Sequence, residues 1–149
     1  MKRQMLRRVF PAVLCMLVLA LPAQGELLSK RYQFKAGVVL EMSVPTRSGL
    51  RLDTVTFEMP ETVEGRLTVA SGLLRARVVV SNLGADARKV GLAIALYDDE
   101  DRLLAVASGG SKLASIKPDR ARTYSLVFEG VFAEALRATT FQISLEEKN

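Results

Sequence analysis

The sequence predicts an all-β domain, an immunoglobulin-like antiparallel β-sandwich of seven or eight strands. Three observations support this fold class. Apolar and polar residues alternate over most of the chain, which is the pattern of strands that bury one face. Gly, Pro, Asn and Asp interrupt this alternation at short intervals, as expected for turns between strands. No segment carries a long apolar repeat of helical period, so the pattern favours a core between two sheets.

The first alternating run lies at 32–44, with its apolar residues at one parity. Gly37 interrupts the run, and its missing side chain permits a bend or a bulge. Residues 45–49 begin with Pro and end with Gly, which is typical of a turn. We therefore expect 26–49 to be an N-terminal strand and linker, with the strand added to an edge of the sandwich.

The sandwich itself is predicted within 50–149. Its strands are short alternating runs at 50–59, 67–69, 74–80, 89–97, 103–108, 124–128 and 141–145. A single helical turn is expected within 131–137. The apolar residues on the inward parity form the predicted core, which comprises Val55, Phe57, Val78, Val80, Leu92, Ile94, Leu96, Leu126, Phe128, Phe141 and Ile143.

The first 25 residues have the organisation of a secretory signal peptide. Basic residues in MKRQMLRR precede an apolar run at 9–21, and Ala23-Gln24-Gly25 is a small-x-small cleavage site. The run is shorter than the roughly 18 apolar residues that a spanning helix needs. We expect cleavage after Gly25, a periplasmic or secreted protein, and no membrane span after cleavage. An uncleaved membrane anchor is the alternative.

Removal of this segment changes the charge and the cysteine content of the chain. Four of the 21 basic residues and none of the 16 acidic residues precede Glu26, which leaves 17 against 16. Nucleic-acid binding needs a basic patch or stripe, so we exclude it. The only cysteine, Cys15, is lost with the signal peptide, so the hydrophobic core must hold the fold without a disulfide.

The residue types that are missing exclude several kinds of catalysis. The chain has no His, and no Cys follows the expected cleavage site. Ser-His-Asp and Cys-His nucleophilic sites are therefore excluded, as are the usual zinc ligand sets. We expect a protein that is not an enzyme, with no catalytic residues and no cofactor. Carboxylate, lysine or tyrosine chemistry stays open as the alternative.

Four consecutive acidic residues lie between the runs 89–97 and 103–108: Asp98, Asp99, Glu100 and Asp101. In a hairpin turn, Asp98 would accept hydrogen bonds from the backbone ahead of it. Asp101 would adopt the left-handed conformation that usually favours Gly, while Asp99 and Glu100 face water. A calcium site is the alternative, but adjacent acids lack the alternate spacing of an EF-hand loop. We predict a solvated turn that needs no metal.

Three other side chains are candidates for binding. Arg75 and Arg77 share one face of a strand and would suit an acidic partner, although we favour the interpretation that they belong to a solvated sheet face. Tyr97 would line a ligand groove or, alternatively, pack at the edge of the sandwich with its hydroxyl in water.

Several short motifs occur in an order that is similar to a known family. They are Val-Ser-Asn at 80–82, Leu-Ala-Ile-Ala-Leu-Tyr-Asp at 92–98, Leu-Leu at 103–104 and Ile-Lys-Pro-Asp at 116–119. The pattern resembles extracytoplasmic immunoglobulin-like domains of the FxLYD type, with Ile94 standing where that name has Phe. The resemblance covers roughly 67–128. It implies an immunoglobulin-like fold and a cell-envelope setting, and it brings no catalytic residues with it.

Together these observations predict a non-catalytic binding or structural module of the cell envelope that acts through contacts with an envelope protein. Gly91, Ala93 and Ala95 share one face of their strand, where small side chains would let a partner surface lie close. The alternatives are a small-ligand or glycan-binding carrier, which would need a deep apolar cavity, and a carboxylate-based hydrolase, which needs two carboxyl groups across a cleft.

Overall fold

The computed structural model describes residues 26–59, 62–63, 66–67, 73–129 and 132–148. The expected signal peptide at 1–25 lies outside these residues. The end of the strand expected at 67–69 also lies outside them.

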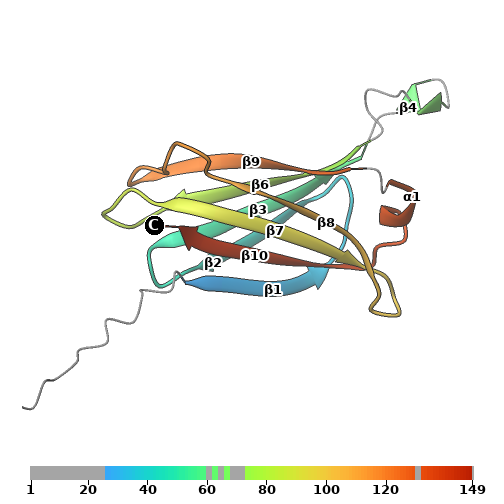
Figure 1. Ribbon diagram of the computed structural model, residues 1–149, viewed down its shortest axis with the longest axis horizontal. Helices are drawn as coiled ribbons and strands as arrows, with labels where there is room; N and C mark the ends of the chain where they lie inside the picture. Colours follow the sequence, from blue (N-terminus) through green and yellow to red (C-terminus); the bar gives the residue numbers. More distant parts are fainter. Residues whose placement is uncertain (1–25, 60–61, 64–65, 68–72, 130–131, 149) are drawn as a thin grey trace, which may run out of the picture.

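Two antiparallel sheets of four strands pack face to face, which confirms the predicted all-β sandwich (Figure 1). The β7 sheet contains, in spatial order, β1 (Leu27–Gln33), β10 (Thr140–Lys148), β7 (Lys89–Tyr97) and β8 (Leu103–Gly110). The β6 sheet contains, in spatial order, β2 (Val39–Pro45), β3 (Leu50–Glu58), β6 (Leu74–Asn82) and β9 (Arg120–Phe128).

Three short elements complete the described chain. β4 (Thr62–Val63) pairs with β5 (Arg66–Leu67) between β3 and β6, and the pair extends from one end of the sandwich (Figure 1). α1 (Phe132–Ala135) connects β9 to β10, within the range where a helical turn was predicted. Its Ala135 side chain is buried against the core.

The strand order corresponds to that of an immunoglobulin-type sandwich. β3, β6 and β9 take the places of strands A, B and E, whereas β7, β8 and β10 take those of C, C′ and F. Strand β1 lies antiparallel beside β10, where the last immunoglobulin strand normally follows strand F. The N-terminal segment of the described chain therefore completes the sheet that an immunoglobulin domain completes with its C-terminal strand.

The prediction of a single strand across 32–44 is wrong. The structure divides this segment between β1 and β2, which lie at the edges of different sheets. The chain crosses at Gly37, whose φ of 71° is strained for other residues, and the Gly37 N–H donates to the Phe57 carbonyl at 2.8 Å. The alternation of apolar residues continues unbroken from β1 into β2, because both strands bury their apolar side chains in the same core. Residues 26–49 are thus part of the sandwich, rather than a strand and linker.

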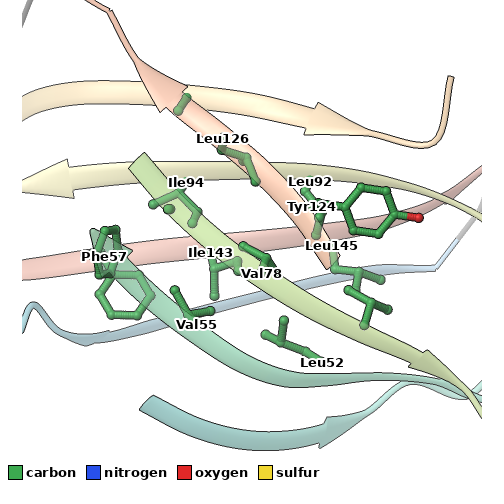
Figure 2. Packing of buried hydrophobic residues seen from close by; sticks show 14 of the residues in the cluster. Leu52, Val55, Phe57, Val78, Leu92, Ile94, Tyr124, Leu126, Ile143 and Leu145 are labelled. Carbon is green, nitrogen blue, oxygen red and sulfur yellow. The ribbon is translucent and has the colours of Figure 1, made fainter. Parts of the chain in front are cut away.

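The core lies between the two sheets, and all eleven predicted core residues are buried there, none more than 3% exposed. Figure 2 shows Val55, Phe57 and Val78 of the β6 sheet directed into the same interior as Ile94 and Ile143 of the β7 sheet. The ring of Phe57 meets that of Phe141 edge-on, with 4.9 Å between the centroids. Such aromatic contacts across the sheets add to the burial of apolar area as a source of stability.

Candidate functional site

The acidic turn connects β7 to β8 with the predicted hairpin geometry. The Oδ1 atom of Asp98 accepts hydrogen bonds from the N–H of Glu100 at 3.1 Å and from the N–H of Arg102 at 2.9 Å. Asp101 has a φ of 65°, the left-handed conformation predicted for it. A register shift follows in the β7–β8 pairing, as a bulge requires. The geometry of the turn therefore explains why these two positions are Asp: Asp98 accepts backbone hydrogen bonds, and Asp101 adopts the left-handed conformation.

The prediction that the whole acidic turn is solvated is wrong for Asp98, whose side chain is only 1% exposed. Its Oδ2 atom accepts from Nε of Arg102 at 2.9 Å and lies 3.5 Å from Nη2 of Arg137. The backbone hydrogen bond from Arg102 lowers the pKa of Asp98, although desolvation opposes this effect. Arg137 follows α1, so only the tertiary fold brings its guanidinium to this carboxylate.

Glu100 and Asp101 form ion pairs with different arginines. Glu100 lies 2.7 Å from Nη1 of Arg102, and Asp101 lies 2.5 Å from Nη1 of Arg31 on β1. Asp99 is exposed. No group of three metal-ligating side chains that could hold an ion occurs within the described residues. The turn is thus linked by ion pairs to β1 and to the segment after α1.

Arg75 and Arg77 lie on the outer face of the β6 sheet, among acidic side chains of the same face. Arg77 forms an ion pair with Glu58 at 2.6 Å, and Glu58 is also the register partner of Arg75 on β3. Arg51 pairs with Asp53 at 2.5 Å on the same strand as Glu58. This arrangement supports the solvated-face interpretation of the two arginines.

Tyr97 lies on the outer face of the β7 sheet, so the structure does not bring it together with Arg75 and Arg77. The guanidinium of Arg31 covers its ring at 4.1 Å from the centroid, and its hydroxyl donates to Oε1 of Gln142 at 3.5 Å. Its half-buried ring supports the packing interpretation, because the contacts on its face come from the same molecule.

An open hollow lies on the outer face of the β7 sheet. It encloses about 490 Å³ and is lined mainly by small side chains of β7, β8 and β10. Its small lining residues include Gly91, Ala93, Ser108 and Ser144, and Lys112, Glu146 and Lys148 contribute charged groups. Two of the three small residues singled out in the sequence therefore line a depression in the surface. A Cβ added at Gly91 would lie 2.7 Å from Cε of Lys148, so the missing side chain also makes room for this lysine.

A second groove of about 410 Å³ lies between β1 and β2, where the chain crosses from one sheet to the other. Tyr32, Leu40 and Met42 contribute apolar surface to it, and Lys35 and Glu41 contribute charge. Burial raises the pKa of the Tyr32 hydroxyl. The sequence did not indicate this groove, because it arises from the division of one alternating run between two sheets.

Comparisons of the chain with models of known protein families, with curated proteins and with solved structures found no match. Within the part of the chain that the structure describes, no helix is long and apolar enough to cross a membrane.

Proposed function

We propose that this protein is a non-catalytic binding or structural module of the cell envelope that docks a partner protein on the outer face of its β7 sheet. The observation that carries the proposal is the hollow around Gly91 and Ala93, where small side chains predominate and the charged residues Lys112, Glu146 and Lys148 also contribute to the lining. The centres of protein interfaces are depleted of charged residues, because unpaired charges are costly to desolvate.

The small side chains of β7 also affect how near a partner can come. Ala93 is partly exposed, Gly91 is buried beside the Lys148 side chain, and Ser108 and Ser144 on the neighbouring strands are short and polar. A flat partner surface would approach the sheet closely at these positions. Hydroxyl groups at the margin offer hydrogen bonds without the entropy cost of ordering long side chains.

The cellular setting of the proposal rests on the sequence. The basic segment, apolar run and small-x-small site within 1–25 support export to the periplasm or beyond. The FxLYD-type resemblance supports membership in a group of extracytoplasmic immunoglobulin-like domains. The partner would accordingly be another envelope protein. A small-ligand or glycan-binding carrier, or a carboxylate-based hydrolase, remains the competing class of function.

Site-specific photo-crosslinking in intact cells tests this proposal. A crosslinking residue at Ala93 should give a discrete adduct with one protein partner, whereas the same residue at Ser125 on the outer face of β9 should not. Ser144→Arg should abolish the adduct by filling the hollow, and the matched Ser125→Arg should leave it intact. Equal adducts from both faces would contradict the proposal. A small molecule that co-purifies and is displaced by Ser144→Arg would support a carrier instead.

A further inference from the structure

The four edge strands of the sandwich differ in how they are protected. β1 and β8 border the β7 sheet, and β2 and β9 border the β6 sheet. An edge strand presents unpaired backbone N–H and C=O groups that can pair with another chain. Natural proteins usually block such pairing with charges directed inward, proline or bulges.

Three of these edges carry such protection. On β1, Lys30 is the register partner of the inward-facing Ile143, so a charge occupies the inner face of this edge. On β9, Arg122 is in the same way the register partner of the buried Val80. β2 contains a register shift between Glu41 and Val44 and ends at Pro45.

β8 has neither charge nor proline in its sequence LLAVASGG. Its irregularities lie at its two ends, the bulge next to Leu103 and the positive φ of Gly110. α1 packs against β8 at the end of the sandwich near the acidic turn (Figure 1). β9 of the β6 sheet also contacts β8 but does not pair with it, so the ladder of backbone groups on this edge has no strand partner within the described residues. Val106, in the middle of the strand, is 55% exposed.

We propose that β8 pairs antiparallel with β8 of a second copy of this chain, which joins the two β7 sheets into one sheet of eight strands. Directly opposed residues of two paired strands point to the same face of the sheet. In an antiparallel pair of identical strands, this is possible only when the two-fold axis passes beside a residue that faces its own counterpart, and not between two residues. Centring the pair on Val106 covers this exposed side chain with its own counterpart. The arrangement has two-fold symmetry and closes as a dimer.

Charge complementarity supports this register. The acidic turn precedes β8 and Lys112 follows it, so antiparallel pairing brings unlike charges together twice. Centred on Val106, the pairing directs Lys112 toward Glu100 of the second copy, and both side chains are exposed. Centred instead on Ala107, it would place Lys112 beside Arg102. Parallel pairing would place the two acidic turns together.

Disulfide trapping after export of the full-length chain tests the register. Val106→Cys should give a disulfide-linked dimer, because opposed Cβ atoms lie about 4.5–5.5 Å apart in a sheet, close to disulfide geometry. Ser108→Cys is the matched control. In this register the two Ser108 residues are offset by four residues along the strands, roughly 13 Å, so the Cys side chains should not cross-link. Cys15 is the only native cysteine and lies in the expected signal peptide. Equal cross-linking of the two variants would overturn the register.

Sedimentation equilibrium of the purified wild-type protein tests the dimer itself. We expect a reversible dimer whose dissociation constant rises at least about tenfold in Val106→Lys, because two like charges then oppose each other. Thr123→Lys on the outer face of β9 should leave dimerisation unchanged. Glu100→Lys should weaken the dimer, and adding Lys112→Glu should restore it. A monomer at all concentrations, or weakening without restoration, would overturn the proposal.

This inference does not depend on the proposed function, and the two can fail separately. Loss of the dimer in Val106→Lys with an unchanged adduct from Ala93 would support both. A monomeric purified protein whose β8 is cross-linked in cells to a different protein would exclude the second copy as the occupant of this edge.

Discussion

The outer faces of the two sheets differ in chemistry although their inner faces share one core. On the β6 sheet, charged side chains project outward and pair with one another, as Arg77 does with Glu58. On the β7 sheet, the central strand carries Gly91 and Ala93, and small side chains predominate in the hollow, which Lys112, Glu146 and Lys148 also line. Ion pairs within a face satisfy its charges in water and oppose the approach of another protein. The small side chains at the hollow of the β7 sheet cost less free energy to desolvate than such charges do. The difference indicates which face suits a partner.

The largest effect is expected when a charge is introduced on the inner face of the β7 sheet, compared with the same charge on its outer face. Ile94→Asp should unfold the domain, because an unpaired buried carboxylate costs several kcal/mol, a large part of the total stability of about 5–15 kcal/mol. Ala95→Asp, one residue further on, faces outward and should leave the domain folded. Far-UV circular dichroism and thermal unfolding distinguish the two variants. A folded Ile94→Asp protein would contradict the assigned orientation of β7.

An intermediate effect is expected at the end of the β7 sheet, where the buried carboxylate of Asp98 pairs with the exposed side chains of Arg102 and Arg137. Asp98→Asn should lower the melting temperature at neutral pH. The pKa of Asp98 is lowered in the fold, so its charge stabilises the protein fully above the ordinary value of 3.8. This stabilisation disappears as the pH falls below 3.8 through the lowered pKa.

Melting temperatures of the wild type and Asp98→Asn should therefore converge in acid. The control Asp99→Asn removes the same charge at an exposed position and should show no such pH-dependent difference. A difference between the wild type and Asp98→Asn that persists in strong acid would mean that the carboxylate acts through packing and not through its charge.

A smaller effect is expected for the charged outer face of the β6 sheet. In a double-mutant cycle of Arg77→Ala and Glu58→Ala, the coupling energy should be about 0.2–1 kcal/mol, because both side chains are partly exposed and water screens the pair. Urea unfolding of the four proteins provides the measurement. A coupling energy well above this range would show that water does not screen the ion pair. The outer face of the β6 sheet would then not differ from that of the β7 sheet in its exposure to solvent.

The smallest effects are expected in the exposed part of the acidic turn. Asp99→Asn combined with Glu100→Gln should be nearly neutral for stability. Asp101→Gly should change it by no more than about 0.5 kcal/mol, because Gly adopts the φ of 65° without strain while the exposed pair with Arg31 is lost. Millimolar calcium should shift the melting temperature no more than magnesium does. A calcium-specific rise that vanishes in the Asp99/Glu100 variant would identify a metal site.

The sequence predicted the interior more completely than the surface. Each strand alternates with period two, so the burial of Val55, Ile94 and Ile143 followed from local pattern alone. The roles of Asp98 and Asp101 also followed locally, since turn geometry depends on a few adjacent residues. Arg31 and Arg137 pair with this turn but come from distant segments of the chain, so the sequence around the turn could not predict these ion pairs.

The amino-acid sequence by itself determined the fold class, the buried side of each strand and the geometry of the acidic turn, because these depend on neighbours within a few residues. Tertiary structure alone decided how 32–44 divides between two sheets, and that the N-terminal strand takes the last immunoglobulin position beside β10. It also decided which strands are edges, and so why the uncharged β8 matters. These features depend on pairings between strands, which no local periodicity encodes, and the pairing of Leu28 with Leu145 joins residues more than a hundred positions apart.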